Sequence, residues 1–312
     1  MRVPHLSPIA YRRITIVAAI LLAIIIVSGG AVRLTDSGLG CPSWPNCSSG
    51  QLTAHAQSDS HQWIESLNRL FTGLVSVAVI VAVLGSLVRI PKRRDLIWLS
   101  VGLVAGVFAQ AVLGGLTVIF DLKPGFVMAH FLLSIVLLTN ALVLVRRAGQ
   151  PDAPAHAVVT PRTITLGRVL LGLAALVLVS GTVVTGAGPH SGGGKHDDVS
   201  RLDLRIPDVA RVHGTMVMIF LGAVLVMVWV LRRDRAPQSV QQRSTVLLVV
   251  LVAQAAVGYA QYFNDIPALL VGIHHNRSNT SRVFGLSNTL ASAGICSTPP
   301  PLSSRTLAQM AS

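Results

Sequence analysis

The feature that most restricts the fold of this chain is a series of seven long apolar stretches. They lie at about 14–34, 67–88, 97–120, 126–145, 167–187, 212–231 and 246–263. Each is long enough to cross a hydrocarbon core of about 30 Å, which takes roughly 20 apolar residues. Backbone groups that face lipid must be hydrogen-bonded within their own segment, so we predict that all seven are helices. The chain is therefore predicted to be an all-α integral membrane protein.

The amino-acid composition agrees with this prediction. Of the 312 residues, 52% are hydrophobic and only 12% are charged, which is far too little charge for a soluble domain of this size. The net charge of +13 resembles that of a nucleic-acid-binding protein, but the basic residues lie in short loops between the apolar stretches. A surface that follows phosphates needs a solvated face, so we expect no nucleic acid partner.

The distribution of basic residues predicts the orientation in the membrane. Basic residues occur before the first stretch and in every second loop: Arg2, Arg12, Arg13; Arg89, Lys92, Arg93, Arg94; Arg146, Arg147, Arg162, Arg168; Arg232, Arg233, Arg235, Arg243. The intervening segment 35–64 has no Lys or Arg. Positively charged loops stay in the cytoplasm, so we predict a multi-pass protein of the plasma (inner) membrane with a cytoplasmic N-terminus.

Two segments of the chain carry the same residue types at one constant spacing. The recurring pairs are Gln110/Gln254, Ala111/Ala255, Gly114/Gly258, Asp121/Asp265 and His130/His274. Five matches at a single offset argue for an internal duplication. Because each half has an even number of spans, the two halves have the same orientation. We predict two tandem four-helix bundles related by a parallel repeat, with residues 1–147 and 148–275 as the halves.

The repeat predicts an eighth helix that the sequence does not supply. A clean apolar span follows His130, whereas Ser, Thr, Asn and Pro dominate after His274. We interpret residues 276–312 as an atypical polar tail that replaced this helix, as a shift of reading frame near the codon for His274 would produce. Because this helix would hold His274 in place, we expect the altered tail to impair the protein.

Three histidines begin predicted helices on the side opposite the N-terminus. A His within a membrane helix is costly and is therefore a candidate functional residue. Two imidazoles at one depth on neighbouring helices can hold a haem iron from both faces, and we expect this of His213 and His274. Helix packing or hydrogen bonding is the alternative role. His130 is a weaker candidate, because the corresponding partner position holds Asn68, a poor iron ligand.

Polar residues near the start of the second predicted helix are further candidates. Glu65 falls at the predicted outer boundary, where a carboxylate is costly unless it has a function, although the helix dipole also favours Glu near a helix start. Cys41 and Cys47 lie in the preceding external loop and are expected to form a structural disulfide or a redox-active thiol pair. A metal site is disfavoured because no nearby Cys or His set completes four ligands.

The residues above resemble the haem A synthase family, membrane enzymes that convert haem O to haem A for cytochrome oxidase. The resemblance covers roughly residues 10 to 275. It rests chiefly on the motif G-G-x-V-R-L-T-x-S-G-L-G-C-P-x-W-P-x-C at residues 29–47. Shorter matches are Glu65, the H-F-L-L-S that starts at His130, the R-V-H-G around His213 and the G-I-H that ends at His274.

The resemblance implies two haem sites in two four-helix bundles. Residues 1–147 would hold the haem O substrate, and residues 148–275 would hold a haem b cofactor. His213 and His274 resemble the cofactor ligands. His130 resembles a ligand of the substrate haem, with Asn68 at the position where many members have a second His.

The resemblance also implies the reaction, which is the oxidation of the C8 methyl group of haem O to a formyl group through successive hydroxylations. Glu65 matches the acidic residue of the family that takes part in catalysis, and Cys41 with Cys47 matches its external cysteine pair. The haem sites lie toward the external face. With the altered tail we expect weak haem b binding and impaired activity.

The implied partners are haem O, a haem O synthase that acts upstream, and a membrane electron donor that the sequence does not identify; a homo-oligomer is compatible with this assignment. The main alternative is a bis-His electron-transfer subunit of the cytochrome b type. It explains His213 and His274 but neither Glu65 nor the cysteine loop. A secondary transporter with duplicated halves is a third class, but the helices lack the broken midplane segments that such proteins use.

Overall fold

The computed structural model describes residues 5–47, 50–54, 59–152, 157–190, 192–193, 199–264, 270–271 and 273–274. Its helices are α1 (Pro8–Leu34), α2 (Ser60–Val88), α3 (Arg94–Ile119), α4 (Pro124–Ala148), α5 (Pro161–Ala187), α6 (Ile206–Arg233) and α7 (Gln238–Phe263). All seven are long and apolar enough to span a membrane, which confirms the seven predicted spans. Within the described ranges there is no β-strand. The protein is an all-α, multi-pass membrane protein.

The helices extend beyond the apolar windows because polar residues cap them. Asp59 accepts a hydrogen bond from the backbone N–H of Gln62 at 2.9 Å, so α2 begins at Ser60 rather than near residue 67. Ser7 caps α1 in the same way, by accepting from the backbone N–H of Ala10 at 3.2 Å. A capping side chain lowers local hydropathy but satisfies a backbone donor that the helix itself leaves unpaired.

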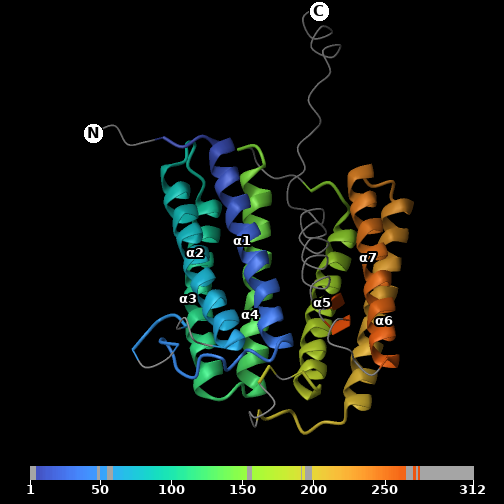
Figure 1. The fold of residues 1–312 in the computed structure, drawn as a ribbon. Coiled ribbons are helices and arrows are strands. Elements are labelled where there is room, and N and C mark those ends of the chain that lie inside the picture. Colours follow the sequence, from blue (N-terminus) through green and yellow to red (C-terminus); the bar gives the residue numbers. More distant parts are fainter. Residues whose placement is uncertain are drawn as a thin grey trace, which may run out of the picture.

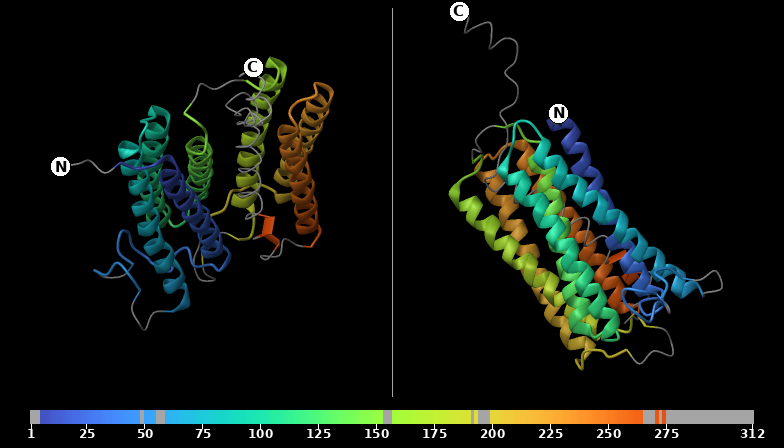
Figure 2. Two further views of the ribbon diagram at one scale, coloured as in Figure 1. Left: turned by 90° about the horizontal axis from the view of Figure 1, so that it is seen from above. Right: turned by 90° about the vertical axis from the view of Figure 1, so that its left-hand side faces the viewer.

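The buried apolar side chains form two clusters, one in each group of helices. The first lies among α1 to α4 and includes Leu22, Val79 and Leu103. The second lies among α5 to α7 and includes Phe220 and Val224. Figures 1 and 2 show these groups side by side, with α4 and α5 where they meet. Large apolar side chains such as those of Trp98 and Phe108 point outward, as expected of helices in contact with lipid.

The chain order places the predicted site residues at one end of the helices. Figure 1 shows that the loop after α1, the start of α4 and the start of α6 all lie at the end opposite the N-terminus. The predicted eighth helix beyond His274 and the polar tail at 276–312 lie outside the described residues, as does Asp265. Residues 270, 271, 273 and 274 are helical, and the last of them is His274.

A polar cluster closes the other end of the first helix group. Arg89, whose side chain is 1% exposed, donates from one nitrogen to both carboxylate oxygens of Asp152, at 2.8 and 3.1 Å. Arg93 donates to Asp95 at 2.6 Å, and this hydrogen bond raises the pKa of the Arg93 guanidinium above its usual value. The cluster therefore fastens the turn between α2 and α3 to the segment after α4.

Removing the Asp152 charge should destabilise the protein. Asp152→Asn leaves the buried Arg89 guanidinium without its counter-charge, and we expect the free energy of unfolding to fall by roughly 1–3 kcal/mol. The measurement is the thermal unfolding midpoint in detergent. Asp208→Asn is the matched control, because Asp208 forms exposed ion pairs of 3.7 and 4.0 Å, which contribute little. Equal midpoints for the two variants would contradict this account of the cluster.

Candidate functional site

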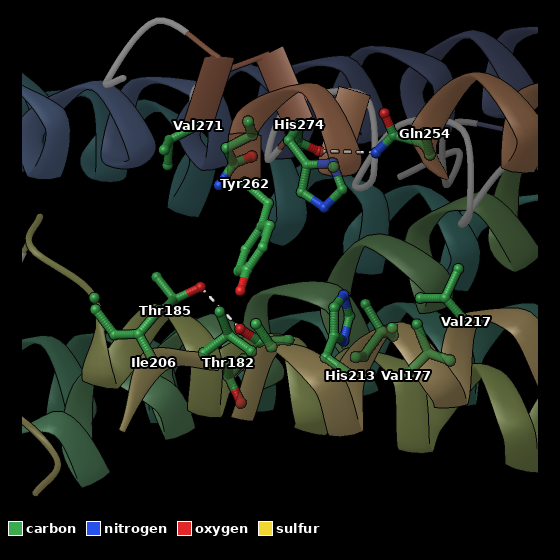
Figure 3. Close-up of a pocket in the computed structure, with 18 of the residues that line it drawn as sticks. Val177, Thr182, Thr185, Ile206, His213, Val217, Gln254, Tyr262, Val271 and His274 are labelled. Carbon is green, nitrogen blue, oxygen red and sulfur yellow. Dashed lines mark hydrogen bonds between the residues drawn. The ribbon is translucent and has the colours of Figure 1, made fainter. Parts of the chain in front are cut away.

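The second helix group contains a cavity of about 600 Å³. Its walls come from α5, α6, α7 and the segment with His274, and residues of α1 and α4 complete the lining. Most of the lining side chains are apolar, Val177, Val217 and Val271 among them. Figure 3 shows the imidazoles of His213 and His274 pointing toward each other from opposite sides of this cavity. The structure thus brings together the two histidines that the sequence pairs.

The orientation of His213 is set by a serine on the neighbouring helix. Ser180 Oγ lies 2.9 Å from His213 Nδ1 and donates its own proton to the carbonyl of Val177 at 3.0 Å. This contact involves Nδ1 and leaves Nε2 as the nitrogen that could ligate a metal. A hydrogen bond at the other ring nitrogen is typical of histidines that ligate a metal.

Glycines of the facing helices leave space for both rings. A Cβ atom at Gly181 of α5 would lie 3.1 Å from Cε1 of His213. A Cβ atom at Gly258 of α7 would lie 3.2 Å from Cε1 of His274. In addition, Gln254 Nε2 donates to the backbone carbonyl of His274 at 2.9 Å, which holds this segment against α7.

The first helix group holds His130 through the same kinds of contact. A Cβ atom at Gly114 of α3 would lie 3.4 Å from Cε1 of His130. Gln110 Nε2 donates to the carbonyl of His130 at 3.0 Å, as Gln254 does to His274. Among the described residues, the buried Nδ1 of His130 has no hydrogen-bond partner.

Asn68 contacts a serine of a neighbouring helix, as His213 does. Ser28 Oγ donates to Asn68 Oδ1 at 2.7 Å, and the Ser180–His213 contact is its counterpart. A Cβ atom at Gly29, which follows Ser28, would meet nothing within 4 Å. Among the described residues the space beside Gly29 is therefore open, whereas the His213 ring lies beside Gly181.

Glu65 is buried where α2 meets the cysteine loop, and it is 6% exposed. Its Oε1 accepts from Arg69 Nη2 at 2.5 Å and from Nε at 3.0 Å, and its Oε2 accepts from the backbone N–H of Cys41 at 2.7 Å. Arg69 also donates to the carbonyls of Cys41, Ser43 and Asn46. The Glu65–Arg69 pair therefore clamps the loop onto α2. Arg69 was not a candidate from sequence, although its i,i+4 spacing from Glu65 was a visible signal.

Cys41 and Cys47 are joined by a disulfide, and both residues are 0% exposed. Within the described residues no group of three or more His, Cys, Asp or Glu could hold a metal ion. Between the two cysteines, Trp44 packs against α3, because a Cβ atom at Gly115 would lie 2.8 Å from its ring. Gly115 directly follows Gly114, the residue that abuts His130. The loop therefore packs against α3 one residue beyond the glycine that abuts His130.

The chain is similar to proteins of one family. The family described as COX15-CtaA, cytochrome oxidase assembly protein, matches residues 12–189, which is more than half of the chain. The protein named heme A synthase of Listeria welshimeri is 28% identical over 131 residues, 42% of this chain and 43% of the relative. That of Shewanella oneidensis is 30% identical over 150 residues, 43% of this chain and 44% of the relative. The matched part spans less than half the length of these relatives.

The fold and the site define a multi-pass helical membrane protein with a cavity flanked by two histidines. The match to a family model identifies the family within this class of protein. The chain belongs to the COX15-CtaA family of cytochrome oxidase assembly proteins. The match ends before α6, so His213 and His274 are candidates because of the geometry and not because of the match.

Breaking the Glu65–Arg69 clamp should expose the disulfide. The variants are made with Cys296→Ser, so that Cys41 and Cys47 are the only cysteines. Glu65→Gln and Arg69→Gln each remove charge-assisted hydrogen bonds worth about 1.5–3 kcal/mol. We therefore expect reduction of the disulfide by a water-soluble thiol to accelerate about tenfold or more. Maleimide labelling followed by mass measurement gives the rate. Arg205→Gln is the control, because the Arg205 side chain is 83% exposed. Unchanged rates in both clamp variants would show that the loop is held by other contacts.

Proposed function

We propose that this protein is a haem A synthase, which oxidises the C8 methyl group of haem O to a formyl group and so makes haem A for cytochrome oxidase. The observation that carries the proposal is the pair of imidazoles, His213 and His274, that face each other across one cavity. Two imidazoles on opposite sides of a cavity in a helix bundle suit the axial ligation of a haem iron.

The residues around the cavity fit a haem b. A cavity of about 600 Å³ is within the usual size range of cofactor sites. Its walls are largely apolar, Gly181 and Gly258 make room for the two rings, and the contact with Ser180 leaves Nε2 of His213 as the nitrogen that could ligate the iron. A haem bound between His213 and His274 would supply one-electron transfer. The protein holds the ligands in position and keeps water out of the apolar site.

The first helix group is the proposed site of the haem O substrate. The Gln–carbonyl, Gly–ring and Ser–partner contacts around His130 and Asn68 are the counterparts of those around His274 and His213. This agreement supports an internal duplication with residues 1–147 and 148–275 as its halves. His130 is then the protein ligand of the substrate haem. Asn68 provides hydrogen bonding instead of a second ligand, which leaves one face of the substrate more open.

Glu65 is the proposed catalytic residue of the substrate site. It lies three residues before Asn68 on α2, so both side chains project from the same face of the helix. Arg69 and the N–H of Cys41 donate hydrogen bonds to its carboxylate. An ionised carboxylate can accept the protons that leave the substrate as its methyl group is oxidised. The clamp formed with Arg69 fixes the position of that carboxylate.

The enzyme is proposed to lie in the plasma membrane and to depend on two partners. The basic loops support a protein of the plasma (inner) membrane whose N-terminus lies in the cytoplasm. The haem sites then lie toward the external face. Haem O comes from a haem O synthase, and a membrane partner exchanges the electrons. Residues 276–312 are polar in sequence where the repeat predicts an apolar span, so we expect a lower affinity for haem b than in a chain whose sequence continues as such a span.

The test of the proposal is the conversion of haem O. The protein, Glu65→Gln and Arg69→Gln are each produced together with a haem O synthase, and the extracted haems are separated by chromatography. We expect haem A from the unaltered chain and equal haem b in all three proteins. Haem A should fall about 100-fold or more in Glu65→Gln, which loses the proton acceptor, and less in Arg69→Gln, which keeps the carboxylate.

Two outcomes would contradict parts of this proposal. Haem A at the unaltered level in Glu65→Gln would exclude a catalytic role for this carboxylate. Bound haem that changes redox state without any haem A, even in the unaltered chain, would instead identify an electron-transfer subunit of the cytochrome b type.

A further inference from the structure

One arginine of the first helix group takes part in the cavity of the second. Arg33 lies near the end of α1, but its Nε donates to the carbonyl of His190 at 2.8 Å and its Nη2 to the carbonyl of Thr185 at 3.0 Å. Close by, the N–H of Gly38 donates to the carbonyl of Gly192 at 2.8 Å. Arg33 is also part of the cavity wall. The site in the second group is therefore completed by a residue of the first.

The charge of Arg33 has no opposite charge beside it within the described part of the chain. No carboxylate of the described residues lies within 4.0 Å of its guanidinium, whereas Arg69, Arg89 and Arg93 each have one. The hydrogen bonds of Arg33 go to neutral carbonyls at the end of α5, whose helix dipole offsets only part of the charge. An arginine in a largely apolar wall without a counter-charge is costly unless a ligand supplies that charge.

The rest of the cavity lining agrees with an acidic ligand. The lining residues include Arg33, Arg211 and His190 but neither Asp nor Glu. Arg33 donates to the carbonyl of Thr185, so the position of Thr185 in Figure 3 marks the end of the cavity where Arg33 lies. Val217 lies toward the opposite end. The cavity is thus apolar around its histidines and basic at one end.

We propose that Arg33 binds a carboxylate group of the molecule that occupies this cavity, and thereby fixes how that molecule is turned about the axis between the two histidines. The identity of the molecule rests on the proposed function, which makes it a haem, and the carboxylates are then its two propionates. Arg33 is a binding and positioning residue supplied by the N-terminal half. The cofactor consequently ties the two helix groups together where α1 and the end of α5 meet.

The test compares haem b with its dimethyl ester, in which both carboxylates are blocked. The full chain is produced without haem supply, purified in detergent and titrated with each porphyrin, and the Soret absorbance gives the dissociation constant. We expect the unaltered chain to bind the free acid about tenfold or more tightly than the ester, as one charge-assisted hydrogen bond allows. Arg33→Gln should remove most of this preference while it leaves the affinity for the ester nearly unchanged.

Three further variants make the comparison specific. Arg33→Lys should keep part of the preference, because it retains the charge but lacks the planar fork of donors. Arg205→Gln, an exposed arginine outside the cavity lining, should keep all of it. Arg211→Gln should keep most of it, because the Arg211 side chain is 79% exposed.

The outcomes separate this inference from the proposed function. Equal affinity of the unaltered chain for the acid and the ester would overturn the role of Arg33, and so would a full preference in Arg33→Gln or its loss in Arg211→Gln alone. Each of these three results leaves the haem site itself intact. Binding of neither porphyrin to the unaltered chain would overturn the haem site and this inference together.

Discussion

The arrangement of this protein depends on how an imidazole ring is held between apolar helices. A ring of this size needs space that a side chain on the facing helix would fill, and its polar atoms need partners. His130, His213 and His274 each lie against a glycine of a neighbouring helix, with 3.1–3.4 Å between the ring and the position of an added Cβ atom. The position of each His is therefore set by two helices together.

The two helix groups share several kinds of contact but differ in the side chains that make them. In the second group a histidine occupies the place beside Ser180 and Gly181, whereas in the first Asn68 binds Ser28 and, among the described residues, the space beside Gly29 is open. The second group therefore has two histidine rings that lie against glycines, and the first group has one. This difference is what the proposed roles require, because a cofactor that only transfers electrons is held from both faces, while a substrate must be reached by the catalytic groups and must leave.

The sequence predicts the features that depend on local patterns. The seven spans follow from hydropathy, and the constant spacing from Gln to His predicts that Gln110 and Gln254 act alike, as their bonds to the two histidine carbonyls show. It does not predict contacts that depend on the course of the loops. The arginines Arg69 and Arg33 bind carbonyls of the cysteine loop and of the end of α5, which no periodicity reveals. His190, which follows α5, lines the cavity for the same reason.

The central claim is that His213 and His274 hold one haem between them. The most direct test is a reduced-minus-oxidised spectrum, with chromatography of the extracted haem, on the purified protein and on His213→Ala and His274→Ala. We expect a low-spin haem B in the unaltered chain and loss of the low-spin spectrum in each variant, because a single imidazole leaves the iron short of one strong axial ligand. A preparation without haem, or a low-spin spectrum that survives in both variants, would contradict this claim.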